Sequence, residues 1–347
     1  MGIQYLNRFL REKCKDSIQF IPLSELNGKK IAVDISIYMY KYTSDESLIE
    51  NMYLMLSVFR FYNIIPVFIF DGKPPTEKKE LIIKRVQDKK NAQEEYNKLK
   101  QNLETNKTLD EEEKQEIIGN MDVLKKQFIH ISKNQIEDVK NLIRAYGASY
   151  YDAPGEADEL CAKLVLKGKV WACLSEDMDM FVYGVNRVIR YLSLLNHTAV
   201  LYDMKGILET LEITQKELRE ICVLSGTDYN IITKDKTNED KNNIDKGPNL
   251  YKTVKYFKLY KKKDEFNDET KDKMCFYNWL LENTDYINND NLSSLQKIYS
   301  MFDLLSIEET DDKLKMFNTI SIVNGPIIRS NMREILEKDG FVFPLNT

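Results

Sequence analysis

Short apolar runs alternate along the first part of the chain with longer stretches that carry apolar side chains at helical spacing. Runs bounded by charged or turn residues are typical of strands, and spacings of three and four are typical of helices. We expect strands at residues 29–34, 64–70, 148–151, 169–174, 188–192 and 199–202, and helices from residue 35 and over 136–146, 152–168 and 215–224. Strands that alternate with helices predict an α/β fold with a mainly parallel, twisted central sheet flanked by helices.

Two polar regions interrupt this alternation. Residues 77–120 are highly charged and almost free of glycine and proline, which suits long solvated helices. Residues 230–246 are rich in Asn, Asp and Lys and indicate a mobile loop, after which the sequence is mostly helical. We therefore predict a core over 1–230, with a helical insertion over about 76–132, and a helical C-terminal region over 231–347.

The composition excludes several classes of protein. The chain has 347 residues, 43% of them hydrophobic, and its apolar runs are too short for a membrane helix. Met1–Leu6 lacks signal-peptide character, and Leu6 argues against myristoylation at Gly2. Five scattered cysteines without ligand spacing indicate reduced thiols in an intracellular protein. With 2 histidines, a His-rich metal site or a Ser-His-Asp triad is not expected, so metal chemistry has to use oxygen ligands.

The net charge of -5 is unevenly distributed. Residues 73–90 hold seven basic side chains against three acidic ones, and residues 252–263 hold six basic side chains and no acidic one. Local stripes of this kind, more than the sum, decide where a polyanion docks. Both stretches are therefore candidate contacts for a nucleic acid backbone.

Carboxylates gather where the expected strands end and the expected helices begin. They are Asp34, Asp71, Glu156, Asp158, Asp177, Asp179 and Asp228. Each has an ordinary explanation, because Asp71 precedes a glycine in a turn, and Glu156 and Asp158 in a first helical turn would meet the helix dipole. In an open α/β sheet, however, the carboxyl ends of the strands share one edge. Seven acids gathered there, with no matching Arg or Lys among them, need a cationic partner.

Oxygen ligands favour hard cations, so we expect Mg²⁺, with Mn²⁺ as a substitute. Seven carboxylates exceed the needs of one ion and fit two ions about 4 Å apart, partly bound through water. Such a pair activates a water and stabilises the leaving oxygen in phosphodiester hydrolysis. The pattern therefore predicts a two-metal hydrolase.

Five motifs occur in a fixed order over residues 1–230. They are MGI at 1–3, VDIS at 33–36, PVFIFDGKPP at 66–75, YDAPGEADELCAKLVLKGKVWACLSEDMD at 151–179 and LSGTDY at 224–229. Together they resemble the flap endonuclease family, the structure-specific 5′ nucleases that include exonuclease 1 and the xeroderma pigmentosum group G nuclease. The resemblance implies a PIN-like 5′ nuclease fold, two-metal cleavage at the base of a 5′ flap, and metal binding by the seven acids. Asp158 stands where the family usually has Glu, one methylene longer.

The same resemblance implies roles for three further residues. Lys78 and Arg85 lie seven positions apart and share a helix face. Spacing alone indicates a solvated basic face. The resemblance instead implies that Lys78 and Arg85 are the family's catalytic Lys and Arg, which bind the scissile phosphate. The charged region up to residue 120 would form a helical arch for a single strand. Tyr40 would stack on a base beside the cut, with an ordinary core tyrosine as the alternative.

Lys246–Lys252 resembles a degraded form of the family's Gly-Ile-Gly-Pro hairpin, part of a helix-two-turn-helix. This implies duplex docking near 244–263, with Gly247 and Lys252 as DNA contacts, alongside Gly2 at the N-terminus. Asp245 replaces the first glycine of the hairpin, which counts against a K⁺ site there.

Two further departures from the family bear on selectivity and partners. The 37 positions that separate Asp34 from Asp71 are few for the family, which puts 3′-flap selectivity in question. Residues 340–347 contain no recognisable sliding-clamp peptide, so clamp binding is not expected.

We therefore predict a monomeric, Mg²⁺-dependent 5′ flap endonuclease or 5′→3′ exonuclease that acts on branched or flapped DNA in replication, repair or recombination. It would work in the nucleus, or at a cytoplasmic replication site if the chain is viral. A sibling activity on bubbles or junctions stays open, as does a catalytically silent DNA-binding scaffold. The acids count against the scaffold, because a pure binder gains affinity by losing negative charge near phosphates. A phosphatase with an aspartyl nucleophile is a third alternative, but its covalent chemistry would need one dominant Asp instead of seven acids spread along the chain.

Overall fold

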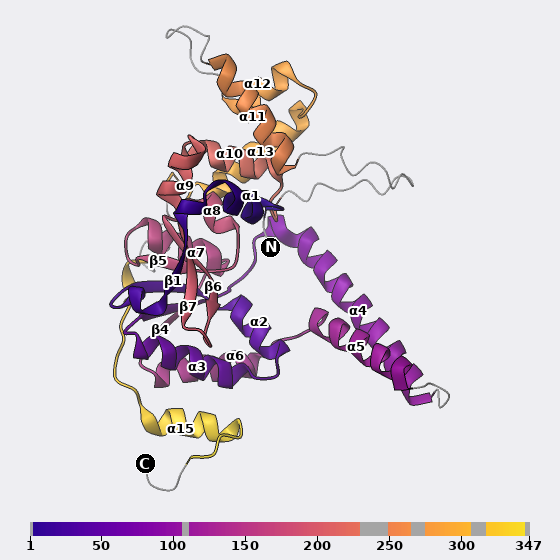
Figure 1. Cartoon of the computed structure of the whole chain (residues 1–347), viewed down its shortest axis with the longest axis vertical. Helices are drawn as coiled ribbons and strands as arrows, with labels where there is room; N and C mark the ends of the chain where they lie inside the picture. The colour runs from indigo at the N-terminus through magenta and orange to yellow at the C-terminus, as the bar shows by residue number, and fades with distance from the viewer. Residues whose placement is uncertain (1–2, 106–110, 230–248, 265–274, 307–316, 344–347) are drawn as a thin grey trace. The chain divides into compact units, whose positions relative to one another are not determined.

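The structure is a computed structural model of the 347-residue chain (Figure 1). It describes residues 3–105, 111–229, 249–264, 275–306 and 317–343. By its internal contacts the chain forms two compact units. The first unit comprises Met1–Val33 and Ala157–Ser321, and the second unit comprises Asp34–Glu156 and Ile322–Thr347.

The sheet is mixed and has seven strands in the order β1-β7-β6-β5-β2-β3-β4. The strands are β1 (Ile18–Pro22), β2 (Lys30–Asp34), β3 (Ile65–Phe70), β4 (Ser149–Asp152), β5 (Ala172–Leu174), β6 (Arg187–Ser193) and β7 (Thr198–Asp203). The pairs β2–β5, β5–β6 and β3–β4 are parallel, whereas β7 is antiparallel to both β6 and β1. The predicted α/β fold with a mainly parallel sheet is therefore confirmed.

In the first unit, short helices accompany the strands. They are α1 (Leu6–Lys13), α7 (Ala157–Leu166), α8 (Asp179–Tyr183), α9 (Met204–Leu211), α10 (Gln215–Ser225), α11 (Leu250–Asp264), α12 (Phe276–Asn283) and α13 (Asn289–Phe302). All three residues of β5 are buried, as expected for a central parallel strand with both faces covered. Phe181 of α8 packs edge-on against Tyr202 of β7, with 5.4 Å between the ring centroids.

In the second unit, long helices follow the strands. They are α2 (Ser36–Ser44), α3 (Leu48–Phe61), the 3₁₀ turn η3 (Thr76–Lys78), α4 (Lys79–Thr105), α5 (Glu111–Gln127), α6 (Lys133–Ala145) and α15 (Arg329–Lys338). Figure 1 shows α4 and α5 side by side as an extended hairpin. The highly charged stretch therefore forms the long helices that its composition predicts. Ser132 begins α6 with a reciprocal capping box to Gln135.

The segment from Ile322 onward returns to the second unit. The N–H of Gly325 donates to the carbonyl of Gly147 at 2.8 Å, and the N–H of Ile328 donates to the carbonyl of Ala145 at 2.7 Å. Gly147 has φ +69, and a Cβ there would lie 2.6 Å from the Gly325 backbone, so both the conformation and the close approach require glycine. Helix α15 then packs against α6 (Figure 1).

The structure differs from the sequence-based expectations in several places. Strand β1 and helices α1, α3, α8 and α9 were not predicted. Helix α7 begins at Ala157, so Pro154 and Glu156 precede the helix instead of lying in its first turn, whereas Asp158 lies there as predicted. Strand β5 begins at Ala172, later than the predicted 169.

The predicted loop over 230–246 lies outside the described residues except at its edge. Most of the described residues after 249 are helical, as predicted. No helix in the described part of the chain combines the length and apolar character that a membrane span needs. The predicted boundary between a core and a C-terminal region at residue 230 stays a prediction.

Candidate active site

In the second unit, the loops that carry Asp71 and Glu156 are tied together by backbone contacts. Asp71 follows β3, and the N–H of Gly72 donates to the carbonyl of Gly155 at 2.7 Å. A Cβ on Gly72 would lie 1.9 Å from the carbonyl oxygen of Ala153, so this approach excludes any larger residue. The glycine after Asp71 thus lets two acid-bearing loops meet, which is more than an ordinary turn requires.

Glu156 has a cationic partner within the same unit. The Nζ of Lys78 lies 2.7 Å from Oε2 and 2.9 Å from Oε1 of Glu156. Lys78, the last residue of η3, is 6% exposed. The expectation that no Lys or Arg matches the acids is therefore wrong for Glu156. A buried carboxylate attracts a neighbouring ammonium because both charges are otherwise costly to remove from water.

Arg85 and Tyr40 are accessible, as residues that contact a ligand have to be. Arg85 lies exposed on α4, in the helix that follows Lys78. Tyr40 on α2 is 46% exposed, which does not fit the alternative of a core tyrosine. The Nζ of Lys89 lies 5.1 Å from the centroid of the Tyr40 ring and donates to the carbonyl of Ile129 at 3.0 Å. An exposed ring beside an ammonium group suits stacking on a base next to a phosphate.

In the first unit, four of the acids lie at helix ends and in the loop after β5. Asp158 lies in the first turn of α7, and its Oδ1 accepts the N–H of Glu159 at 2.6 Å. Asp177 and Asp179 flank the start of α8, where Oδ1 of Asp177 accepts the N–H of Asp179 at 3.0 Å. Asp228 follows the end of α10. Helix starts favour negative charge, which offsets part of the mutual repulsion.

Asp158 and Asp179 act electrostatically on the same buried phenol. Tyr183, the last residue of α8, has a pKa raised well above its usual value by burial first, and then by the charges of Asp158, Tyr229 and Asp179. Burial, with the charge of Asp179, likewise raises the pKa of the Cys222 thiol. Asp179 itself is 1% exposed. The carboxylates of Asp158 and Asp179 thus lie near buried groups whose negative forms they disfavour, and a bound cation would offset their charge.

The candidate ligands fit hard divalent cations in their chemistry, because all are carboxylates in a negative field. Asp34, Asp71 and Glu156 belong to the second unit, and the other four belong to the first. Among the described residues, no group of three or more Asp, Glu, His or Cys side chains is arranged to hold a metal ion. The gathering of all seven acids around two ions therefore stays a prediction.

The remaining predicted contacts fall partly outside the described residues. Gly2 and Gly247 are not described, and neither is the replaced glycine position at Asp245. Lys252 is half-buried on α11, near the exposed lysines 255, 258 and 262 of that helix. The predicted basic stripe is thus helical.

Sequence reasoning missed the side chains that hold the acids. The Ser36 hydroxyl donates to Oδ2 of Asp71 at 2.5 Å, and the Ser175 hydroxyl accepts the N–H of Asp177 at 3.1 Å. Ser175 lies two residues before Asp177 in LSEDMD, which was an available signal, whereas Ser36 and Asp71 are 35 positions apart and no local pattern links them. The Ser36 hydroxyl orients a carboxylate without adding charge, and the Ser175 hydroxyl fixes the backbone of Asp177.

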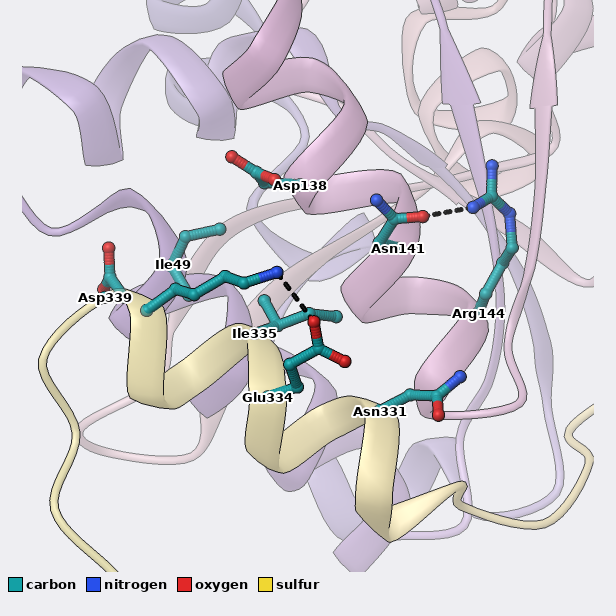
Figure 2. A pocket seen from close by; sticks show the side chains of 9 residues that line it. Ile49, Asp138, Asn141, Arg144, Asn331, Glu334, Ile335 and Asp339 are labelled. Atoms are coloured by element: carbon teal, nitrogen blue, oxygen red, sulfur yellow. Dashed lines mark hydrogen bonds and ion pairs between the residues drawn. The ribbon is translucent and has the colours of Figure 1, made fainter.

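A separate cavity in the second unit takes no part in this site. It measures about 310 Å³ and is lined by Ile49, Asp138, Asn141, Arg144, Asn331, Glu334, Ile335, Lys338 and Asp339 (Figure 2). Two of its charged residues are bonded to neighbours: Lys338 donates to Glu334 at 2.8 Å, and Figure 2 shows Arg144 bonded to Asn141. None of these lining residues is a predicted site residue.

Two family models match the chain: the XPG N-terminal domain over residues 1–92 and the XPG I-region over residues 147–228. Flap endonuclease 1-B of Physcomitrium patens is 30% identical over 249 residues, which cover 66% of this chain and 67% of that protein. The chain belongs to the XPG and flap endonuclease family. The predicted family is therefore confirmed.

Other members of the XPG and flap endonuclease family match over less of their length. Flap endonuclease 1 of Lodderomyces elongisporus is 28% identical over 248 residues, which cover 66% of this chain and 61% of that protein. Flap endonuclease 1 of Cryptosporidium parvum is 31% identical over 263 residues, which cover 66% of this chain and 50% of that protein. The chain thus spans about half to two thirds of these relatives.

Solved structures of the family share the fold over nearly the whole chain. The catalytic core of Rad2 in complex with DNA substrate aligns with a TM-score of 0.61 and 22% identity, covering 97% of this chain and 94% of that one. Human GEN1 in complex with Holliday junction DNA aligns with a TM-score of 0.57 and 17% identity, and the alignment covers 98% of this chain and 74% of the GEN1 chain. GEN1 in complex with product DNA and an Mg²⁺ ion aligns with a TM-score of 0.55 and 17% identity, and the alignment covers 95% of this chain and 72% of the GEN1 chain.

Proposed function

We propose that this chain is a Mg²⁺-dependent, structure-specific 5′ nuclease that hydrolyses a phosphodiester of branched or flapped DNA and leaves a 5′-phosphate and a 3′-hydroxyl. The observation that carries the proposal is the set of seven carboxylates within or at the ends of the two matched family regions. A Mg²⁺ ion is named in the GEN1 complex with product DNA, which supports the same choice of cation.

Two bound Mg²⁺ ions would supply an activated water and stabilisation of the leaving oxygen. Asp34, Asp71, Glu156, Asp158, Asp177, Asp179 and Asp228 are the proposed ligands, directly or through water. Asp158 has one methylene fewer than the usual Glu, so we assign it to a water-mediated contact. The hydroxyl of Ser36 and the backbone N–H of Asp179 hold two of these carboxylates in fixed orientations.

The basic residues of the second unit provide the positive charge that a phosphate needs. Lys78 is fixed beside Glu156, and the exposed Arg85 extends the same charge along α4. Both would stabilise the negative charge that grows on the phosphoryl oxygens during hydrolysis. Tyr40 would stack on the base next to the cut, and the α4–α5 hairpin would contact the single strand as an arch.

Duplex DNA would dock on the basic face of α11. Lysines 255, 258 and 262 are exposed on α11, whereas Lys261 pairs with Glu217 at 2.5 Å. Phosphate contacts of this kind make binding fall steeply with salt. The proposed setting is DNA replication, repair or recombination, in the nucleus or at a viral replication site, without a clamp contact through residues 340–347.

The test is a panel of end-labelled flap, nick, bubble and four-way substrates, each incubated with Mg²⁺, Mn²⁺ or Ca²⁺. We expect cleavage of 5′-branched substrates with Mg²⁺ and Mn²⁺ and binding without cleavage with Ca²⁺. A bulky group on the 5′ end separates an enzyme that threads the strand from one that does not. Binding of every substrate with no cleavage under any metal would contradict the proposal and leave a DNA-binding scaffold.

A further inference from the structure

A β-bulge in β6 changes the direction of two residues beside the loop that carries Asp177 and Asp179. β6 and β7 stay in register up to the pair Arg190–Val200, and the next pair is Ser193–Thr198, so β6 has one extra residue in this interval. Tyr191 lies in the bulge with φ +54, a left-handed conformation that a bulky side chain rarely adopts. Bulges re-aim side chains and free backbone groups from the strand ladder.

The freed groups bind Glu176, the residue immediately before Asp177. The N–H of Tyr191 donates to Oε1 of Glu176 at 2.5 Å. The guanidinium of Arg190 donates from Nη2 to the backbone carbonyl of Glu176 at 2.9 Å, and its Nε lies 3.4 Å from Oε2 of the same residue. Side chain and backbone of Glu176 are therefore both held by two successive residues of the bulge.

The same strand holds the loop at two further points. The N–H of Ser175 donates to the carbonyl of Ile189 at 3.2 Å, and Nη1 of Arg190 donates to Sδ of Met178 at 2.8 Å. Ser175 and Met178 bracket the loop on either side of Asp177. Three successive residues of β6, Ile189, Arg190 and Tyr191, thus hold the loop through Ser175, Glu176 and Met178.

Helix α1 forms a second layer behind Arg190. Oδ1 of Asn7 accepts from Nη1 of Arg190 at 3.0 Å and from the hydroxyl of Tyr202 at 2.8 Å, while Nδ2 of Asn7 donates to the hydroxyl of Tyr191 at 2.7 Å. The Arg190 side chain also lies over the rings of Tyr191 and Tyr202, and Arg190 is 6% exposed. Burial and these partners restrict the orientations that the Arg190 guanidinium can take.

We propose that Arg190 is a positioning residue that holds the 175–179 loop in the conformation that binds divalent metal, with Asn7 of α1 fixing Arg190 in turn. This inference rests on the proposed function only in taking Asp177 and Asp179 as metal ligands. Groups that orient metal ligands, without touching the metal, typically contribute 10- to 100-fold to metal affinity. Arg190 satisfies this description because it pairs with the Glu176 carboxylate and holds the Glu176 backbone and the Met178 side chain on either side of Asp177.

The test measures metal binding directly, by calorimetric titration of the DNA-free protein with Mn²⁺. Arg190→Met keeps the length of the side chain but removes its charge and donors, and we expect Mn²⁺ affinity to fall about 10- to 100-fold. Arg190→Lys keeps the charge and one donor and should restore part of the affinity. Asn7→Ala, on the exposed side of the network, should weaken Mn²⁺ binding by a smaller factor and serves if Arg190→Met does not fold.

The control is Arg60→Met in the second unit. Arg60 donates to the backbone carbonyls of Tyr146 at 2.5 Å and Gly325 at 2.6 Å, so its loss removes comparable hydrogen bonds in a different region. We expect this variant to lower the melting temperature and to leave Mn²⁺ affinity unchanged.

Equal Mn²⁺ affinity in wild type, Arg190→Met and Asn7→Ala would overturn the inference, and so would equal losses in Arg190→Met and Arg60→Met. A failure of the proposed function would give a different set of results. In that case the wild-type protein binds Mn²⁺, Arg190→Met binds it less tightly, and neither protein cleaves any DNA in the substrate panel.

Discussion

The ion pair between Lys78 and Glu156 sets a measurable part of the stability of the metal-free protein. Its charges lie 2.7 Å apart, and the two side chains are 8% and 20% exposed. At an effective dielectric constant of about 20, such a pair attracts by about 6 kcal/mol. Desolvation of both groups offsets much of this, and removal of one partner from a buried pair costs about 3–5 kcal/mol. Because the Glu156 side chain keeps some contact with water, we take the lower end of this range, about 3 kcal/mol, as the expected loss of stability.

Lys78→Met is therefore expected to lower the free energy of unfolding by about 3 kcal/mol at pH 7, since it keeps the apolar stem and removes only the charge. Urea unfolding in the presence of a chelator measures this value without a contribution from bound metal. In Lys78→Met/Glu156→Gln the isolated carboxylate is gone, and most of the loss should be recovered. The double-mutant cycle then gives the coupling between the two side chains.

The matched control is Lys125→Met, which breaks an ion pair with Glu46 that also joins distant parts of the second unit. Its side chains are 53% and 71% exposed, so solvent screens the pair and the urea midpoint should not change. A Lys78→Met protein that unfolds within about 0.5 kcal/mol of wild type, or one that Glu156→Gln fails to rescue, would refute the assignment of a stabilising buried pair.

Three further outcomes are expected. Asp179→Ala should abolish cleavage and preserve DNA binding in gel-shift assays with Ca²⁺, and retained activity would reject its role as a metal ligand. Arg85→Ala should slow single-turnover cleavage about 10²- to 10³-fold with little change in DNA affinity, and an unchanged rate would remove it from the phosphate site. Burial raises the pKa of Glu220 from 4.5 to about 7; the charge of Lys216 opposes this in part, and the charge of Glu217 adds a smaller upward effect. The folded state therefore binds the extra proton between about pH 4.5 and pH 7, and stability falls as pH rises through this window. Glu220→Gln should remove that slope and raise the free energy of unfolding at pH 8 by about 3 kcal/mol, whereas an unchanged pH profile of thermal unfolding would contradict this pKa.

The elements that the sequence predicted best are those with a strong local pattern. The apolar runs of β2 and β3 and the charged stretch of α4 and α5 each have the predicted type because burial or solvation alone decides it. Strand β1 was missed because it pairs only with β7 at the sheet edge, and of its five residues Ile21 alone is buried. The pattern of apolar and polar positions is too weak there to indicate a strand.

The site was predictable in its residue types and less so in its contacts. The acids and their order came from the motifs, which are local in sequence. The partner of Glu156, however, lies 78 positions away, and Arg190 lies 14 positions from Glu176 across a strand pairing. Which cation meets which carboxylate depends on tertiary packing, and no spacing rule in a single sequence encodes it.

Neither compact unit is a continuous piece of the chain. The second unit takes its last contribution from the segment after Ile322, where Gly325 and Ile328 form backbone hydrogen bonds with the turn that precedes β4. A ribosome therefore has to synthesise the whole first unit before these bonds can form. The chain accordingly cannot acquire its native structure in the order in which it is made, and a fragment that ends at residue 321 would leave the Gly147 turn without the segment that pairs with it.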